Sequence, residues 1–184
     1  MSLYPNGEAA LQRFFEANPL YFLAVNGVPA QAGEAHKEIF GDPPAGWTFT
    51  TKFVFGYQSG DGQLVAMTTV VSDLLARGVW HVVTFILETA RHGTGEAQAL
   101  YGSLEEWAVR GGARWLRLGV VRGNTRAERF WATRGFFQVA TRQGVVMGRN
   151  NNDIRVMVKP LHGQPVSEYY DLVERDRARV ANAA

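Results

Sequence analysis

A glycine-rich turn at Gly93, Thr94 and Gly95 joins an apolar, strand-like run to an amphipathic helix that starts with Glu96 and Ala97. Without a side chain at either glycine, the backbone can approach an anion closely. The unpaired N–H groups of the first helical turn would converge on that anion, together with the positive end of the helix dipole. This junction is therefore predicted to bind a diphosphate through its main-chain amides.

Two common phosphate-binding motifs do not fit this turn. The loop of nucleotide hydrolases requires Gly-Lys followed by Ser or Thr, whereas Gly95 is followed by Glu96 and Ala97. A dinucleotide fingerprint would need a third glycine at position 98, which is Gln98, and an upstream βαβ unit that the sequence does not offer. A plain turn that starts a helix is the structural alternative, so the surroundings must decide the function.

The composition limits the classes of protein and of site. A length of 184 residues with 46% hydrophobic content fits one globular domain. The absence of cysteine excludes disulfides, a thiolate zinc site and a cysteine nucleophile, and His36 and His162 show no metal-ligand spacing. A net charge of +2 gives no argument for a nucleic-acid partner, and no apolar run is long enough to cross a bilayer. Because the first residues lack the regions of a signal peptide, we expect a cytoplasmic protein.

Arginines gather around the glycine turn. Residues 91–142 contain nine arginines and no lysine, against four glutamates. The planar guanidinium suits phosphate oxygens, which predicts a phosphate-rich small ligand held by two or three of these arginines. The others are expected on the solvated surface of helices and strands.

The spacing of apolar residues predicts the elements that position the turn. Helices are expected over 8–17, 31–40, 97–110, 124–134 and 167–184, and strands over 20–25, 52–57, 63–75, 79–87, 115–121, 136–147 and 154–158. Because a helix separates 79–87 from 115–121, these two strands should run parallel, with 79–87 in the middle of the sheet. Thr125 and Glu128 have capping-box spacing. A polar loop over 149–153 is expected between the last two strands.

The order of these elements and two motifs resemble the GNAT superfamily of acyl-CoA-dependent N-acyltransferases. The first motif, Arg91-His92-Gly93-Thr94-Gly95-Glu96-Ala97, is similar to the family's Gln/Arg-x-x-Gly-x-Gly/Ala loop, with His92 in the Gln/Arg place. The second is similar to the family's strand, Asn-x-x-Ala helix and Gly-Phe ending, and comprises residues 116–120, Asn124, Ala127, Phe130, Trp131, Gly135 and Phe136. The resemblance covers about residues 8–160 and is most specific over 79–136.

The resemblance implies an α+β fold in α/β/α layers, with a mixed, mostly antiparallel central sheet, a splayed parallel strand pair and flanking helices. The family domain would occupy residues 1–162, followed by a helical tail at 163–184. Acetyl-CoA or another acyl-CoA would be the donor, bound between strands 79–87 and 115–121, and no metal would take part. The implied cofactor-binding residues are Phe85, Leu87, His92, Gly93, Thr94, Gly95, Glu96, Ala97, Asn124, Phe130 and Trp131.

Individual roles also follow from the resemblance. Main-chain groups near Phe85 and Leu87 would pair with the pantetheine arm, and the amide of Leu87 would donate to the oxyanion of the tetrahedral intermediate. Asn124 would bond to the same arm or simply cap its helix. Family members often have a tyrosine in the place of Trp131, where its hydroxyl protonates the leaving thiolate, and an indole does not do this easily.

The acceptor amine must lose a proton before it attacks a thioester. At pH 7, an alkylamine with a pKa of about 10.4 costs about 4.6 kcal/mol to deprotonate. His81 is the preferred base, because imidazole titrates near neutral pH and its position on the strand before the loop resembles that of bases in some family members. A structural histidine would give the same sequence. Glu88 is the competing base, although strict alternation places it on the opposite face from His81 unless a bulge lies between them.

The sequence therefore predicts an N-acyltransferase that moves an acetyl group to a primary amine by direct attack in a ternary complex. A catalytically silent acyl-CoA-binding sensor or interaction domain, and a nucleotide-binding domain, stay open as alternatives. The acceptor, a small amine or a peptide, is not identified, and Tyr21, Trp47, Phe49 and Tyr57 are candidates for its pocket. Neither nucleic acid nor membrane is expected as a partner. The C-terminal helix and a sheet edge near 137–147 are compatible with a homodimer.

Overall fold

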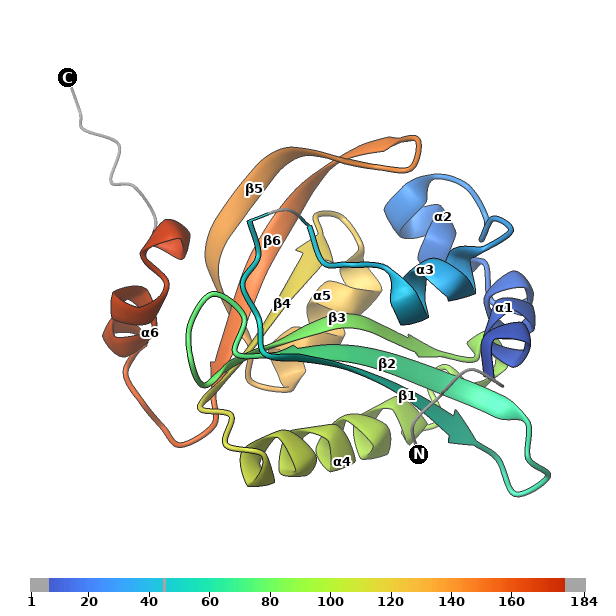
Figure 1. Ribbon diagram of the computed structural model, residues 1–184, viewed down its shortest axis with the longest axis horizontal. Helices are drawn as coiled ribbons and strands as arrows, with labels where there is room; N and C mark the ends of the chain where they lie inside the picture. Colours follow the sequence, from blue (N-terminus) through green and yellow to red (C-terminus); the bar gives the residue numbers. More distant parts are fainter. Residues whose placement is uncertain (1–6, 45, 178–184) are drawn as a thin grey trace.

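The computed structural model describes residues 7–44 and 46–177. These residues form one six-stranded sheet in the order β1-β2-β3-β4-β6-β5 (Figure 1). Its strands are β1 (Thr51–Gln58), β2 (Leu64–Ser72), β3 (Val79–Leu87), β4 (Trp115–Val121), β5 (Phe137–Met147) and β6 (Asn150–Pro160). Neighbouring strands are antiparallel except β3 and β4, which run parallel across the intervening helix. The predicted fold class and the central place of β3 are confirmed.

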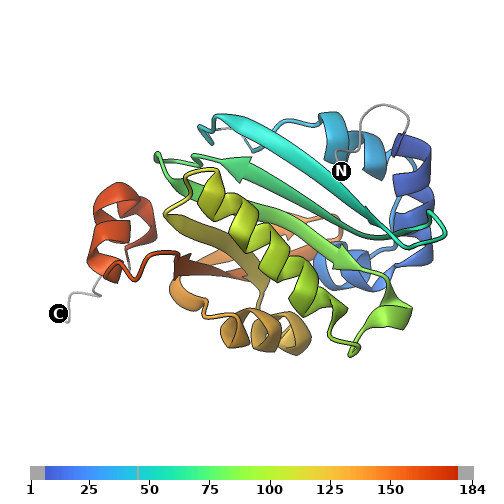
Figure 2. The same cartoon turned by 90° about the horizontal axis from the view of Figure 1, so that it is seen from below.

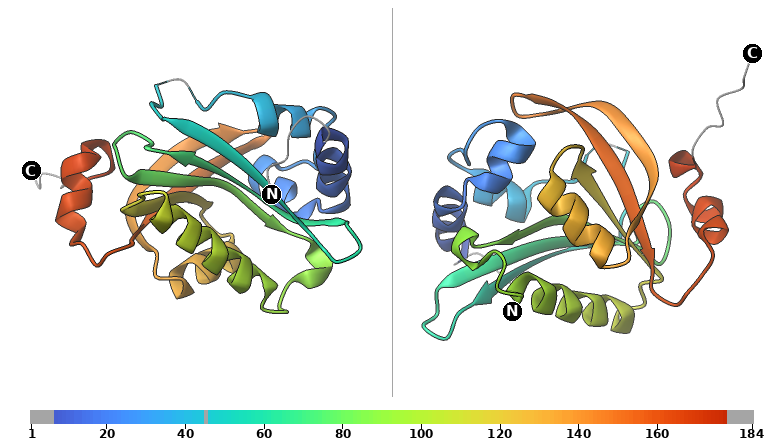
Figure 3. Two further views of the ribbon diagram at one scale, coloured as in Figure 1. Left: turned by 60° about the horizontal axis from the view of Figure 1, so that its bottom comes forward. Right: turned by 180° about the vertical axis from the view of Figure 1, so that it is seen from behind.

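Helices cover both faces of the sheet. They are α1 (Glu8–Ala17), α2 (Leu20–Asn26), α3 (Glu34–Phe40), α4 (Glu96–Arg110), α5 (Thr125–Thr133) and α6 (Val166–Leu172), with 3-10 turns η2 (Thr89–Arg91) and η3 (Glu174–Asp176). The long helix α4 and α5 lie along one face (Figure 2). On the other face, α1 to α3 pack at one end and α6 at the opposite end (Figure 3). No helix of the described residues covers the middle of that second face.

Successive side chains of β3 point to opposite faces of the sheet, so this strand contributes to the cores on both faces. Trp80 packs into the core beneath α4 and α5, while its neighbour Val79 packs into the core beneath α6. Further along, Phe85 packs against the α4 and α5 core and Ile86 against the core of α1 to α3. A strand covered on both faces is mostly apolar, and the sequence of β3 is apolar apart from His81 and Thr84.

The parallel pair β3 and β4 separates soon after it starts. Val79–Val82 pair with Trp115–Leu118, and within the described residues no pairing between the two strands continues beyond this point. Their carboxyl-terminal halves are therefore splayed, and main-chain groups of β3 face an open gap. This gap is where the candidate site lies.

A β-bulge interrupts β3 at Val83. Thr69 pairs with Thr84 and Val70 pairs with Val82. Over this stretch, β3 therefore has one residue more than β2. The extra residue shifts the alternation by one position. By register, position 88 therefore returns to the face of His81, although seven residues separate the two.

The predicted strand over 20–25 is wrong, because this segment forms helix α2. A short apolar run fits either element, and the flanking residues decide. Pro19 is the N-cap of α2, where its missing N–H costs nothing, and Gly27 ends the helix in a left-handed conformation with φ of +72°. Asn18 closes α1 by donating from its side chain to the Phe14 carbonyl at 2.9 Å.

Three other boundaries also differ from the prediction. The strand predicted to reach Leu75 stops at Ser72, because Asp73 and Leu75 both have positive φ angles. The polar stretch predicted as a loop belongs to β6, where the side-chain amide of Asn152 donates to the Val25 carbonyl at 2.8 Å. The tail helix ends at Leu172, and residues 178–184 of the predicted helix lie outside the described residues.

The sequence offers two candidates for the N-cap of helix α5, Thr125 from the capping-box spacing and Asn124. Asn124, not Thr125, is the N-cap, and its side chain accepts a hydrogen bond from the Ala127 amide at 3.2 Å. Glu128 reaches back to the Gly123 amide at 3.1 Å. The predictions over 8–17, 79–87 and 115–121 match their elements from end to end.

Candidate functional site

A pocket of about 460 Å³ opens where β3 and β4 diverge, beside the glycine turn. We call it the loop-side pocket. Its lining includes most of the residues that the sequence implicates in donor binding, namely Phe85, Leu87, His92, Gly93, Ala97, Asn124, Phe130 and Trp131. The remaining three, Thr94, Gly95 and Glu96, lie on the turn itself without lining the pocket.

The glycine turn presents amides that the protein itself does not use. Gly93 and Gly95 have φ angles of +86° and +88°, in the left-handed region that side chains disfavour. Within residues 7–44 and 46–177, the amides of Gly93, Gly95 and Ala97 donate to no other protein group. They lie at the positive end of α4, a helix of 15 residues. This arrangement suits an anion such as a diphosphate.

The arginine of the turn is occupied by neighbouring carboxylates. Arg91 donates from Nε to Glu88 at 2.9 Å and from Nη1 to Glu96 at 3.0 Å. Hydrogen bonds to Glu88 first, and then to Glu96, raise the pKa of Arg91 above its ordinary value. Glu88 therefore faces the turn, and it does not line the loop-side pocket.

His92 links the turn to β3 and to α5. Its Nε2 donates to the Leu87 carbonyl at 3.1 Å, which leaves Nδ1 to accept from Nη1 of Arg126. Arg126 lines the same pocket and brings a permanent positive charge beside His92.

The amide of Leu87 points into the gap between the splayed strands. The next amide, that of Glu88, donates across to the Val65 carbonyl of β2 at 2.8 Å. Because successive amides of a strand point to opposite sides, the Leu87 amide is directed toward β4, which has already diverged. The oxyanion role predicted for this amide is compatible with that direction.

Trp131 forms an aromatic wall shared with the core. Its ring centroid lies 5.6 Å from that of Phe85 and 5.5 Å from that of Tyr101. Tyr101 directs its hydroxyl to Glu105 and lines neither this pocket nor the one described next. Tyr101 belongs to the core, since only 3% of it is exposed.

A second pocket, of about 370 Å³, occupies the uncovered middle of the opposite sheet face. We call it the sheet-face pocket. It extends from α2, at the right of Figure 1, to η3, which follows α6 at the left. Its polar and aromatic lining comes from seven separate segments and includes Tyr21, Trp47, His81, Arg117, Asn124, Arg142 and Arg175, above an apolar floor of Val145, Met147, Ile154 and Val156.

The two pockets meet at the splay. Five residues line both of them, namely Tyr21, Phe85, Asn124, Ala127 and Trp131. Asn124 uses its side-chain oxygen as the helix cap, so its capping role is shown. Its amide nitrogen donates to no other described residue and stays available to a ligand. A molecule in one pocket can therefore touch a molecule in the other.

His81 is buried and held by Arg117. Nη1 of Arg117 donates to Nδ1 of His81 at 3.2 Å, and the Trp47 ring packs edge-on with a centroid distance of 5.2 Å. Burial first, and then the charge of Arg117, lower the pKa of His81 well below its ordinary value. Whichever ring nitrogen accepts from Arg117, the other carries the hydrogen of the neutral ring. His81 thus presents a donor to the pocket.

Asp176 joins the C-terminal segment to this histidine and arginine pair. Its fully buried carboxylate accepts from Nε of Arg117 at 2.9 Å, from the Tyr169 hydroxyl at 2.6 Å and from Arg142. Burial pushes the pKa of Asp176 upward, but the hydrogen bonds and charge of Arg117 outweigh it and hold the pKa below its usual range. The tail therefore fixes one wall of the sheet-face pocket.

Tyr21 brings a hydroxyl to the junction of the pockets. Burial first, and then the nearby Glu38 carboxylate, raise its pKa to about 12, so it stays protonated at neutral pH. Of the predicted acceptor-pocket aromatics, Tyr21 and Trp47 line the sheet-face pocket. Phe49 and Tyr57 do not, since Phe49 lies beside the turn after β2 and Tyr57 is half-buried on β1.

Sequence reasoning missed Arg126, Arg142, Arg175 and Asp176. Arg126 had a local signal, because it lies two residues after Asn124 in a motif already recognised. The other three come from β5 and η3, far along the chain from the turn. Their approach depends on the tertiary fold, and no local pattern marks them.

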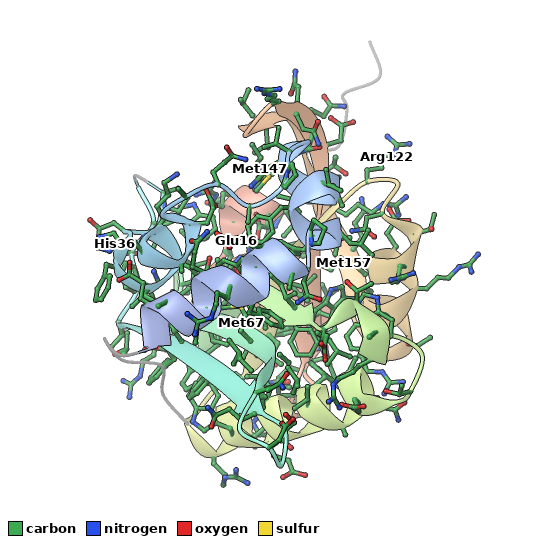
Figure 4. All side chains as sticks on the ribbon, turned by 90° about the vertical axis from the view of Figure 1, so that its right-hand side faces the viewer. Glu16, His36, Met67, Arg122, Met147 and Met157 are labelled. Carbon is green, nitrogen blue, oxygen red and sulfur yellow. The ribbon has the colours of Figure 1, made fainter. Side chains whose placement is uncertain are left out.

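Metal and membrane features were also sought within the part of the chain that the structure describes. No group of three or more histidine, aspartate or glutamate side chains there is arranged to hold a metal ion. His36 lies at the outer edge of the molecule, where it faces Glu8 (Figure 4). None of the described helices has the length and apolar character needed to cross a bilayer.

Comparisons with solved structures give the same fold. The spermidine N-acetyltransferase from Vibrio cholerae, solved in complex with CoA and spermine, aligns with a TM-score of 0.68 and 12% identity over 88% of this chain and 94% of that one. The ribosomal-protein-S18-alanine N-acetyltransferase from Escherichia coli aligns with a TM-score of 0.63 and 14% identity over 90% and 94%. Nourseothricin acetyltransferase aligns with a TM-score of 0.53 and 21% identity over 60% of this chain, which spans only 65% of that chain.

Sequence comparison is more specific. A search of curated protein sequences gives no match. The family model for the acetyltransferase (GNAT) family matches residues 12–136, which include the glycine turn, the splayed strands and α5. The chain belongs to the GNAT acetyltransferase family.

Proposed function

We propose that this protein transfers an acetyl group from acetyl-CoA to a small primary amine by direct attack within a ternary complex. The observation that carries the proposal is the junction of two pockets at the splay of β3 and β4. One pocket ends at free main-chain amides, and the other is lined by polar side chains on the opposite sheet face. Two substrates bound in these pockets would meet beside Phe85, Asn124 and Trp131.

The loop-side pocket would hold the donor. The amides of Gly93, Gly95 and Ala97 and the guanidinium of Arg126 would bind the diphosphate. The pantetheine arm would lie along the unpaired half of β3, with the thioester carbonyl near the Leu87 amide. Family members use acetyl-CoA in this way, and these residues fit that donor.

The sheet-face pocket would hold the acceptor amine. Arg117, Arg142 and Arg175 also line this pocket. The amine attacks the thioester as the neutral base, so its ammonium form would first release a proton to water. His81 could act as the general base only after giving up its contact with Arg117, because its other ring nitrogen already carries a hydrogen.

The reaction then follows from the groups at the junction. The amine nitrogen attacks the thioester carbon, and the Leu87 amide stabilises the oxyanion. Collapse of the tetrahedral intermediate expels the CoA thiolate, and the nitrogen loses its second proton to solvent. Tyr21, which stays protonated at neutral pH, would supply the hydroxyl that Trp131 lacks and donate to the thiolate.

Thiol release from acetyl-CoA tests the proposal. We expect release to depend on an added amine, across a panel of amino acids, alkylamines, aryl amines, polyamines, aminoglycosides and peptides. Calorimetry with CoA and ADP completes the test. Tight CoA binding without turnover of any amine would favour a silent acyl-CoA-binding domain, and equal affinity for ADP and CoA would favour a nucleotide-binding one.

A further inference from the structure

The sheet-face pocket carries an excess of positive charge. Three arginines, Arg117, Arg142 and Arg175, line it, and none of its described lining residues has a carboxylate side chain. The nearest buried carboxylate, Asp176, lies behind the lining and pairs with both Arg117 and Arg142. Three positive charges therefore face one negative charge.

The arginines differ in how much of their bonding capacity is used. Arg117 uses all three of its nitrogens, because Nε and Nη2 donate to Asp176 and Nη1 donates to His81. Arg142 uses only Nη2, which donates to the Arg175 carbonyl at 2.6 Å and to Asp176. The exposed Arg175 side chain makes no ion pair with any described residue. Arg142 and Arg175 thus keep N–H groups for a ligand.

The pocket also has a direction. Its Tyr21 end is shared with the loop-side pocket, where the thioester would lie. Its Arg142 and Arg175 end is built from β5 and η3, which lie on the side of α6 (Figure 1). Between the two ends, the floor is apolar. A ligand that spans the pocket meets a site for the amine, an apolar stretch and then a cationic end.

We infer that the acceptor is a small amino acid-like molecule, with a primary amine at one end of an apolar body and a carboxylate or similar oxyanion at the other. The inference rests on the proposed function and names its substrate class. Guanidinium groups bind oxyanions in bidentate fashion, and a volume of about 370 Å³ suits a body of this size. The same arginines would repel a polyamine, in contrast to the spermine present in the Vibrio cholerae structure.

Three acceptors that differ only in the charge of the tail test this inference. They are 6-aminohexanoate, hexylamine and 1,6-diaminohexane, assayed by thiol release from acetyl-CoA. We expect kcat/KM to be about tenfold or more higher for 6-aminohexanoate than for hexylamine, and lowest for the diamine. Turnover that is equal for all three, or fastest for the diamine, would overturn the inference and leave the proposed acyl transfer intact.

A charge reversal tests the residue that the inference depends on. Arg175→Glu should lower kcat/KM for 6-aminohexanoate at least tenfold and raise it for the diamine. Arg177→Glu is the matched control, because Arg177 lies two residues away, pairs with Asp171 and does not line the pocket. An unchanged order of preference in Arg175→Glu would contradict the inference.

A binding measurement separates this inference from catalysis. Hexanoate, which has the acid but no amine, should bind to the CoA-loaded protein in calorimetry, and Arg175→Glu should weaken it at least tenfold. Hexanoate binding without turnover of any amine would support the anionic pocket and count against acyl transfer. If hexanoate does not bind the CoA-loaded protein, the inference fails whatever the turnover.

Discussion

The two pockets of this protein are built in different ways. The glycine turn of the loop-side pocket is one short segment, and its proposed anion contacts are main-chain amides of residues 93–97 at the start of α4. The polar groups of the sheet-face pocket are side chains from seven segments between Tyr21 and Arg175. The first kind of site tolerates change in most side chains, whereas the second depends on each one.

Diphosphate binding by main-chain amides can be common to many sequences, whereas acceptor binding by side chains can differ from one sequence to the next. A main-chain cradle binds the same diphosphate in any sequence that keeps the turn. Side chains from distant elements can change the acceptor without disturbing that cradle. The family match over residues 12–136 includes the turn and stops before β5, α6 and η3. Substitutions in the two regions should therefore have different consequences.

The largest effect is expected where the tail closes the sheet-face pocket. Asp176→Ala removes the carboxylate that pairs with buried Arg117, and it leaves that guanidinium and the Tyr169 hydroxyl without their partner. Breaking a buried pair on one side costs about 3–5 kcal/mol of unfolding free energy. Urea unfolding measures this loss.

The control for this substitution lies on the same segment. Asp171→Ala removes an exposed carboxylate that pairs with Arg177, and it should cost no more than about 0.5 kcal/mol. A loss below about 1 kcal/mol in Asp176→Ala would show that the tail does not hold the pocket wall.

The same contrast explains which parts of the site the sequence could predict. The turn, β3, β4 and α5 follow one another along the chain, and the family resemblance carried by their motifs placed Gly93, Leu87 and Asn124 at one site. Apolar periodicity also placed β3 in the centre of the sheet. These patterns lie within short stretches of sequence, and the structure contains the elements that they predict.

The acceptor side could not be predicted in this way. Arg117 and Asp176 are 59 residues apart, and only the packing of α6 against β4 brings them into contact. The segment 20–25 was assigned to a strand, so the placement of Tyr21 on α2 beside the splay was not foreseen. The donor hydrogen of His81 also depends on a contact that no spacing reveals.

The next largest expected effect is a loss of CoA affinity, caused by backbone strain in the glycine turn of the loop-side pocket. A Cβ at position 95 would meet nothing within 4 Å, so Gly95→Ala tests conformation and not space. A left-handed conformation costs an alanine about 1–2 kcal/mol, and relaxation to negative φ would turn the adjoining amides away from the anion. We expect a loss of CoA affinity of about tenfold, measured by calorimetry.

Gly60→Ala is the matched control for this substitution. Gly60 also has open space around its Cα, but its φ angle is not in the left-handed region. It lies in the turn between β1 and β2, away from both pockets. Equal CoA affinity in Gly95→Ala and Gly60→Ala would contradict the main-chain cradle.

A smaller effect is expected from Arg126, which lines the loop-side pocket beside the glycine turn. Arg126→Gln keeps a polar side chain at this position but removes the charge beside His92. The KM for acetyl-CoA should rise several-fold, up to about tenfold, while kcat changes little, because the lost contact is with the diphosphate and not the reacting atoms. Arg129→Gln, on the exposed side of the same helix, should leave KM unchanged. The idea that Arg126 replaces the family's loop cation fails if both variants behave alike.

The smallest effect concerns pH and returns to the sheet-face pocket. The pKa of His81 is lowered in the folded protein by burial and by Arg117, whereas in the unfolded chain it is about 6.5. Below about pH 6.5 the unfolded state therefore binds a proton that the folded state does not, and stability falls by up to about 1.4 kcal/mol per pH unit. Asp176 acts in a different pH range, because its lowered pKa removes stability only below about pH 4.

Unfolding free energies measured between pH 7 and pH 5 should fall with pH in the wild type and change less in His81→Gln, with the exposed His162→Gln as the control. An unchanged slope in His81→Gln would mean that the ring is not held neutral, and its acceptance of a hydrogen bond from Arg117 would then be wrong.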